Sequence, residues 1–363
     1  MVMNGLVRGR GGGGSRWAAA GVLALAALVG TGAADADAAG PRALPAGCSG
    51  TSPITCHYGV APGDYDVSVS LGSATSAGQT EMWVESRRLM LPATKTAAGT
   101  VATYSFTVDV RQPEGQPTGE GGTGTAGLDI RFAGSSPQVS AVSVTPASHP
   151  LVAYLAGDST VCDQPTAPYT GWGQMITTAV GPGAVIANYA DSGESSGSFL
   201  ANSVLFPALL SQVRADDLVF IQFGHNDKQT SASAYRSNLT SMITQVRAKG
   251  GVPVLVTPPV RRLFDGDTLT PTALHINGLG VDLPAEMRAV GAAQQVPVID
   301  LTAKSKALVE SLGPDTSAEL YLRSSVDGVT DNTHFSQYGA TRFAGLVRQG
   351  IEEQHLSLTA YLR

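Results

Sequence analysis

Residues 151–160 read LVAYLAGDST, an apolar run that leads directly into glycine, aspartate, serine and threonine. Short runs rich in valine, isoleucine and leucine are typical of strands buried on both faces of a parallel sheet. Four more such runs follow, at 185–190, 218–223, 252–257 and 296–301. Because helical stretches separate them, the pattern predicts a doubly wound α/β domain over 150–363, with five parallel strands.

Polar residues follow each of the first three predicted strands. They read GDST at 157–160, DSGES at 191–195 and GHND at 224–227. In doubly wound sheets the reactive groups lie on the loops beyond the carboxyl ends of the strands. We therefore expect these three loops to form one site.

The residue types needed for acyl transfer occur at both ends of this domain. Ser159 follows the first strand, and Asp331 and His334 lie in the stretch DNTH near the end of the chain. A serine becomes a nucleophile when a histidine takes its proton, and a carboxylate usually orients that histidine. The spacing of Asp331 and His334 lets one loop supply both. The alternative for Ser159 is a helix cap.

An acyl-transfer site also needs hydrogen-bond donors for the negative oxygen of the intermediate. The candidates are the backbone amides of Ser159 and Gly193 and the side-chain amide of Asn226. Glycine has no β-carbon, so its amide can approach a substrate closely. The alternative for Asn226 is a turn residue, and we expect the neighbouring His225 to be structural.

Together these blocks resemble the SGNH (GDSL) hydrolases, whose marker residues are Ser, Gly, Asn and His. A narrower similarity, to the rhamnogalacturonan acetylesterases, rests on YLAGDST at 154–160, GWGQ at 171–174, GESSGSF at 193–199 and FGHND at 223–227. The resemblance covers 150–355 and implies a flavodoxin-like three-layer α/β/α fold without a lid. It implies the catalytic roles given above for Ser159, Asp331 and His334, and oxyanion roles for Gly193 and Asn226. Glu194 departs from the Arg or Gly of many relatives.

The region before the α/β domain has a different pattern. Apolar and polar residues alternate over 65–71, 104–110, 128–132 and 142–144, which predicts antiparallel strands with one buried face. We therefore expect a small β-sandwich accessory module over 61–147. Its ligand is open: Trp83, Arg87 and Arg88 could line a sugar-binding face, although a solvated strand edge is the favoured interpretation.

The first residues have the three parts of a secretory signal peptide. Three arginines precede the apolar stretch 17–29, and small residues follow it. The apolar stretch is too short to span a bilayer. We expect a signal peptide over 1–38, a secreted protein and no stable membrane anchor.

Residues 39–60 are rich in Pro, Gly, Ser and Thr, which predicts an exposed linker. Within it, Cys48 and Cys56 are close enough to form a disulfide in an oxidising compartment. Cys162 is left over, and we expect a buried, unreactive thiol rather than a nucleophile.

Charge and composition exclude several classes of partner. The formal net charge is −6, and the basic residues are scattered, whereas nucleic-acid-binding proteins usually carry a basic face. The histidines outside the motifs are isolated, so no metal site is predicted. We expect no cofactor and a monomer.

Together with the signal-like segment, the resemblance implies a secreted carbohydrate O-acetylesterase that acts on an acetylated plant cell-wall polysaccharide, with pectic rhamnogalacturonan favoured. The alternatives are a lysophospholipase or thioesterase-type lipase and a non-catalytic carbohydrate-binding protein. Arg261 and Arg262 follow the fourth strand and could bind a uronate carboxylate with paired hydrogen bonds. The other interpretation is a surface pair bridged to Asp265 or Asp267.

Overall fold

The computed structural model describes residues 43–363 except 113 and 116–124. The predicted signal peptide over 1–38, the first residues of the predicted linker and most of the glycine-rich stretch at 119–127 lie outside the described residues. Residues 43–363 form one compact unit.

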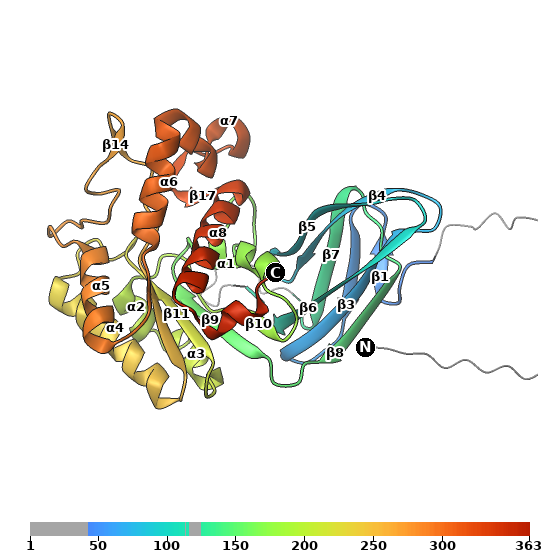
Figure 1. Cartoon of the computed structure of the whole chain (residues 1–363), viewed down its shortest axis with the longest axis horizontal. Helices are drawn as coiled ribbons and strands as arrows, with labels where there is room; N and C mark the ends of the chain where they lie inside the picture. The colour runs from blue at the N-terminus through green and yellow to red at the C-terminus, as the bar shows by residue number, and fades with distance from the viewer. Residues whose placement is uncertain (1–42, 113, 116–124) are drawn as a thin grey trace, which may run out of the picture. The chain divides into compact units, whose positions relative to one another are not determined.

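The predicted five-stranded parallel sheet is confirmed (Figure 1). Its strand order is β10-β9-β11-β12-β15, so the first strand in sequence lies second in the sheet, as in flavodoxin. All four neighbouring pairs are parallel. The strands are β9 (Leu151–Gly157), β10 (Ala184–Asn188), β11 (Leu218–Gln222), β12 (Val252–Val256) and β15 (Val298–Ile299).

Helices cover both faces of this sheet. Along β9, Val152, Tyr154 and Ala156 pack into one apolar cluster, while Ala153 and Leu155 pack into the other. The first cluster is closed by α2 (Ser196–Ala201), α3 (Phe206–Gln212), α4 (Ala232–Ala248) and α5 (Leu283–Gln294). The second is closed by α1 (Trp172–Ile176), α6 (Leu301–Thr316) and α8 (Gln337–Glu353). The three-layer α/β/α arrangement follows from this alternation.

Short elements complete the α/β domain. They are α7 (Ser324–Asp327), the 3₁₀ turns η1 (Thr177–Ala179), η2 (Ser317–Leu320) and η3 (Ser357–Tyr361), and the two-stranded pairs β13 (Phe264–Asp265) with β14 (Thr268–Leu269) and β16 (Tyr321–Leu322) with β17 (Asp331–Phe335).

The region before the α/β domain, called the β-module below, consists of two antiparallel sheets around one apolar core, as the alternation predicted. One sheet has the order β1-β2-β7-β4-β5 and the other β6-β3-β8. Their bounds are β1 (Cys48–Gly50), β2 (Ile54–Tyr58), β3 (Gly63–Ser73), β4 (Gly78–Val84), β5 (Arg88–Thr96), β6 (Thr100–Val110), β7 (Leu128–Ser136) and β8 (Ala141–Pro146).

The prediction of an exposed linker over 39–60 is wrong for its second half. Residues 48–58 form β1 and β2, which pair with each other and extend the sheet at β7. Ile54 and Cys56 point into the core of the β-module and are buried. Their two-residue spacing is a strand signal too short to stand out among the surrounding Pro, Gly, Ser and Thr residues.

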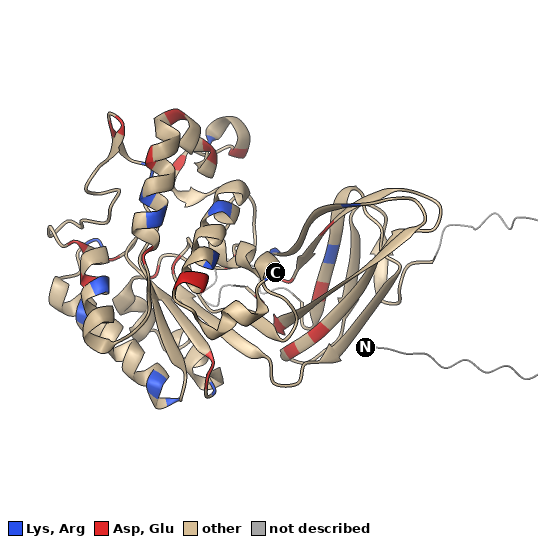
Figure 2. Cartoon of the chain, in the orientation of Figure 1, with Lys and Arg blue, Asp and Glu red and all other residues tan. Residues whose placement is uncertain are grey.

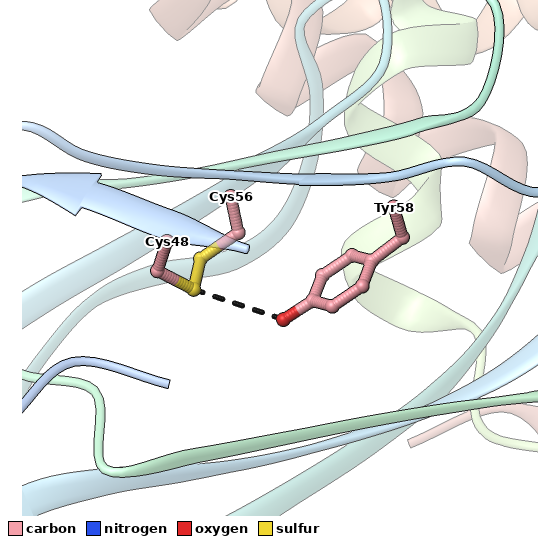
Figure 3. Close-up of a disulfide and its surroundings, with 3 residues drawn as sticks. All are labelled: Cys48, Cys56 and Tyr58. Atoms are coloured by element: carbon pink, nitrogen blue, oxygen red, sulfur yellow. Dashed lines mark hydrogen bonds between the residues drawn. A yellow bond between two sulfur atoms is a disulfide. The ribbon is translucent and has the colours of Figure 1, made fainter. Parts of the chain in front are cut away.

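The predicted disulfide between Cys48 and Cys56 is present (Figure 3). The two residues lie directly opposite each other in the β1–β2 register. The Tyr58 hydroxyl lies 3.7 Å from Cys48 Sγ. The disulfide therefore joins the two strands that begin the described chain.

The interpretation of Arg87 and Arg88 as a solvated strand edge is wrong. The side chain of Arg88 is 1% exposed, and its Nε lies 3.1 Å from Oδ2 of Asp163 in the α/β domain. Trp83 is also buried and, with Leu89, belongs to the same apolar cluster as helices α1 and α8. The β-module and the α/β domain thus share part of one core, and these residues do not form an open sugar-binding face.

Charged residues of both signs are interspersed over the strands and helices (Figure 2). Among the described residues, no helix is long and apolar enough to cross a membrane.

Glu85, between β4 and β5, gives a prediction about stability and pH. Its Oε1 accepts a hydrogen bond from the Asp129 amide, while Oε2 is buried without a hydrogen-bond partner among the described residues. Burial raises the pKa of this carboxyl from its usual 4.5 to about 8. The folded state therefore binds this proton more tightly than the unfolded state, so the stabilisation is present below pH 4.5 and is lost as pH rises toward 8.

We expect Glu85→Gln to remove part of the fall in unfolding free energy between pH 5 and pH 8, by an amount on the order of 1 kcal/mol. Urea unfolding of both proteins across that range measures it. An identical pH slope in wild type and variant would contradict the prediction.

Candidate active site

A continuous hydrogen-bonded chain joins the three residues predicted to carry the chemistry. Ser159 Oγ lies 2.8 Å from Nε2 of His334, and Nδ1 of His334 lies 2.6 Å from Oδ2 of Asp331. Asp331 and His334 both come from β17, so one short strand fixes the carboxylate and the imidazole together. The side chains that sequence spacing placed in one loop are therefore in contact.

The Asp331 carboxylate is held ionised by its neighbours. Burial alone would raise its pKa, but hydrogen bonds from the His334 ring, the His334 amide and the Thr333 amide outweigh that effect and hold the pKa below its usual range. An ionised acceptor at Nδ1 keeps the proton on that nitrogen. The Nε2 lone pair of His334 then faces the Ser159 hydroxyl.

Ser159 is positioned by a turn immediately after β9. The carboxylate of Asp158 accepts hydrogen bonds from the amide and the hydroxyl of Thr160. The backbone carbonyl of Asp158 accepts a hydrogen bond from the Val161 amide. On its other side Asp158 meets Nδ1 of His225 at 3.2 Å. The fully buried Asp158 therefore fixes the backbone on both sides of the serine, and His225 is structural, as expected from the sequence.

The predicted oxyanion donors lie around the same cavity. Gly193 has φ +82°, a conformation that L side chains rarely adopt, and a β-carbon there would meet no atom within 4 Å. The glycine is thus explained by backbone conformation and not by crowding. The Asn226 side-chain amide donates to the Glu194 carbonyl at 3.0 Å, which holds it beside Gly193.

The cavity has a volume of about 490 Å³. Its lining residues are Ser159, Gln164, Pro165, Thr166, Tyr169, Ser192, Gly193, Asn226 and His334.

The segment 164–169 forms one wall of this cavity, and no motif in the sequence marks it. The side-chain amide of Gln164 donates to the Ser159 carbonyl at 3.0 Å. The ring of Tyr169 meets the ring of His334 edge to face, with centroids 5.3 Å apart. A segment rich in proline and threonine carries no periodic signal, so only its position after GDST could have suggested this role.

The β-module supports that wall from behind. Arg87, in the turn between β4 and β5, donates from Nη1 to the backbone oxygens of Gln164 at 3.0 Å and Tyr169 at 2.8 Å. The side-chain amide of Gln174 in turn donates to the carbonyls of Ser86 and Gln164. The accessory module therefore contacts the active-site wall directly.

The two arginines predicted to bind substrate are placed differently from each other. Arg261 donates from Nη2 to the His225 carbonyl at 2.8 Å and from Nη1 to the Thr333 hydroxyl, and it lines a second cavity. Arg262 donates to the Pro314 carbonyl at 3.1 Å and lines neither cavity. In the described part of the chain, neither arginine forms an ion pair with Asp265 or Asp267.

Cys162 is fully buried, and burial raises the pKa of its thiol well above the usual value. Its sulfur lies 3.7 Å from the Ser159 carbonyl oxygen. The expectation of a packed, unreactive thiol agrees with this environment. Within the described ranges, no group of three His, Cys, Asp or Glu side chains could hold a metal ion.

A family model for GDSL-like Lipase/Acylhydrolase matches residues 155–342. The chain belongs to this family. It is 38% identical over 226 residues to the rhamnogalacturonan acetylesterase RhgT of Bacillus subtilis. The matched residues cover 59% of this chain and 94% of RhgT. The probable rhamnogalacturonan acetylesterase YesY of the same organism is 32% identical over 215 residues, covering 57% of this chain and 94% of YesY.

A relative that reaches further along the chain is the uncharacterized esterase YxiM of Bacillus subtilis, 27% identical over 303 residues, which cover 81% of this chain and 73% of YxiM. The crystal structure of YxiM matches with a TM-score of 0.51 and 24% identity, covering 84% of this chain and 81% of YxiM. The family match and the acetylesterase relatives show that this chain is a carboxylic-ester hydrolase. The acetylesterase relatives also support a carbohydrate esterase.

The contact between the β-module and the active-site wall yields a prediction for Arg87→Ala. The substitution removes the charged donor from two backbone carbonyls, and hydrogen bonds to charged groups contribute roughly 1.5–3 kcal/mol. We expect kcat/KM on a small acetyl ester to fall roughly tenfold, because Gln164 and Tyr169 are no longer fixed around Ser159 and His334.

Lys95→Ala, at an exposed position on the same strand β5, is the matched control and should leave kcat/KM unchanged. Millimolar guanidinium should partly restore the Arg87→Ala enzyme. Activity equal to wild type, in a variant with an unchanged unfolding midpoint, would show that the wall does not depend on Arg87.

Proposed function

We propose that the protein is a secreted carbohydrate O-acetylesterase that removes acetyl groups from pectic rhamnogalacturonan. The observation that carries the proposal is the hydrogen-bonded chain from Ser159 through His334 to Asp331, which opens into a cavity bordered by Gly193 and Asn226. The substrate is inferred from RhgT and YesY, whose names state that activity.

The residues support a two-step acyl-enzyme mechanism. Ser159 Oγ attacks the acetyl carbonyl carbon while its proton passes to Nε2 of His334, and the Nδ1 proton stays hydrogen-bonded to Asp331. The oxyanion accepts hydrogen bonds from the amides of Ser159 and Gly193 and from the Asn226 side chain.

Collapse of this intermediate breaks the bond to the sugar oxygen, which takes the proton from His334. A water molecule then attacks the acetyl-serine by the same route in reverse. Its proton passes to His334 and on to Ser159 Oγ, and acetate leaves.

The lining of the cavity favours a small acyl group. Apart from the triad and oxyanion residues, it consists of Gln164, Pro165, Thr166, Tyr169 and Ser192. A lysophospholipase or thioesterase binds a long acyl chain, which needs a continuous apolar surface, and these mostly polar side chains do not provide one. A non-catalytic binding protein would have no need of an aligned serine, histidine and aspartate.

Secretion is supported by two features that belong to different parts of the chain. The signal-like segment over 1–38 is a sequence observation, and the disulfide between Cys48 and Cys56 is a structural one. Disulfides persist in oxidising compartments and are rare in the cytosol.

The proposed roles predict the effect of removing either reacting side chain. Ser159→Ala and His334→Ala should each lower kcat on a small acetyl ester by at least about a thousandfold, because residues of a triad act as a unit. Circular dichroism should show that both variants remain folded. Cys162→Ala should retain activity, and loss of activity there would instead favour the thiol as nucleophile.

Substrate class is tested by acetate release from acetylated rhamnogalacturonan, acetylated xylan and a long-chain ester, measured side by side. We expect the highest kcat/KM on acetylated rhamnogalacturonan and little turnover of the long-chain ester. Chelators should not change the rate, since the mechanism uses no metal. Preference for the long-chain ester would favour the lipase alternative.

A further inference from the structure

A second cavity, of about 390 Å³, lies next to the catalytic one. Its walls come from the loop after β11, which contributes His225 and Lys228, and from the long segment after β12, which contributes Arg261 and His275. The two cavities share a boundary: His225 precedes the oxyanion residue Asn226 in the chain.

The wall of this cavity contains a buried acceptor that lacks a donor. His225 is 2% exposed, and its Nε2 is buried without a hydrogen-bond partner among the described residues. Its Nδ1 faces the Asp158 carboxylate, and hydrogen bonds from His225 and Thr160 outweigh burial and hold the Asp158 pKa below its usual range.

Burial lowers the pKa of His225, so the ring is neutral and carries its proton at Nδ1. The free lone pair is therefore on Nε2. The His225 ring packs edge to face against the His275 ring, with centroids 4.5 Å apart, and the protein covers Nε2, so this atom is not a contact for a ligand.

The remaining charges of this cavity are positive. Lys228 is exposed and Arg261 is half-buried, and neither forms an ion pair in the part of the chain that the structure describes. The described lining contains no Asp or Glu. Arg261 uses Nη1 and Nη2 for Thr333 and His225 but has five N–H groups in all, so donors remain. In a chain of net charge −6, this is a local site for an anion.

We propose that this second cavity is a subsite for a uronic acid residue of the substrate, next to the acetylated sugar. Lys228 and Arg261 bind its carboxylate, and the buried His225 forms part of the wall. The inference rests on the proposed function and deepens it, because it assigns the acidic sugar to named residues. An acyl chain would pack on Leu263, Ile276 and Leu283 of this cavity but would leave both cations without an anionic partner.

The kinetic test compares Lys228→Ala with Lys249→Ala. Lys249 is an exposed lysine at the C-terminal end of α4, just before β12 begins. It therefore lies near the amino ends of the parallel strands, whereas the active site lies beyond their carboxyl ends. Three substrates are used: acetylated rhamnogalacturonan, the same polymer with its carboxylates chemically reduced to alcohols, and a small neutral acetyl ester.

We expect Lys228→Ala to lower kcat/KM on the acidic polymer about tenfold, mainly through KM. The change on the reduced polymer and on the small ester should be less than twofold, and Lys249→Ala should match wild type throughout. The effect should shrink at high salt, where charge attraction near the surface is screened. Equal losses on all three substrates, or no loss on the acidic polymer, would overturn the subsite.

A binding measurement separates this inference from the proposed reaction. In a Ser159→Ala background, calorimetric titration with a deacetylated rhamnogalacturonan oligosaccharide should give about tenfold weaker binding when Lys228 is also replaced. If acetate is released from the polymer but Lys228→Ala binds normally, the subsite is wrong and the proposed function stands. If the polymer is not hydrolysed but binding depends on Lys228, the subsite stands and the proposed function is wrong.

Discussion

The buried carboxylate of Asp163 is the interaction on which the active-site region depends. It lies four residues after the nucleophile and is 1% exposed. Arg88 approaches at 3.1 Å, Arg111 at 3.3 Å and the Asn188 side-chain amide at 2.8 Å. Burying a carboxylate is costly unless it is fully paired. These partners come from β5, the end of β6 and β10, so the carboxylate is satisfied only when the β-module and the parallel sheet are both in place.

This arrangement fixes the start of the cavity wall. The Asn188 amide also donates to the Val161 carbonyl at 2.8 Å, so the turn after Ser159 is bonded to the edge strand β10. Arg87 then holds the following carbonyls of Gln164 and Tyr169. Two neighbouring arginines where the turn meets β5 thus have separate tasks, since Arg88 pairs with a buried carboxylate and Arg87 positions the backbone that faces the substrate.

The site contains two pairs of aspartate and histidine with opposite properties. His334 with Asp331 is partly exposed and faces the serine, so its imidazole can exchange protons during turnover. His225 with Asp158 is buried, and burial keeps that imidazole neutral. The same two residue types therefore serve a reacting role in one place and a fixed hydrogen-bonding role in the other, and the difference is solvent access.

The parallel sheet and the central residues of the site could be predicted because their signals are local. The strands are continuous apolar runs, and Ser159, Gly193, Asn226, Asp331 and His334 lie in short motifs at strand ends. The contacts of Arg87 and Arg88 could not be predicted, since they join residues more than 70 positions apart and the sequence around them reads as an ordinary strand edge. Arg262 donates to the Pro314 carbonyl and lines neither cavity, because adjacency to Arg261 in sequence does not give the two side chains the same direction.

The family model spans 155–342, so the turn that carries Arg87 and Arg88 lies outside it. This has a consequence for how such a protein can evolve. A genetic exchange that replaced the β-module with an unrelated one would leave Asp163 without two of its partners and the Tyr169 carbonyl without Arg87, while the Gln164 carbonyl would keep its hydrogen bond from Gln174. A β-module and a hydrolase part that share these contacts would therefore be expected to diverge together, unless residues of the hydrolase part took over both tasks.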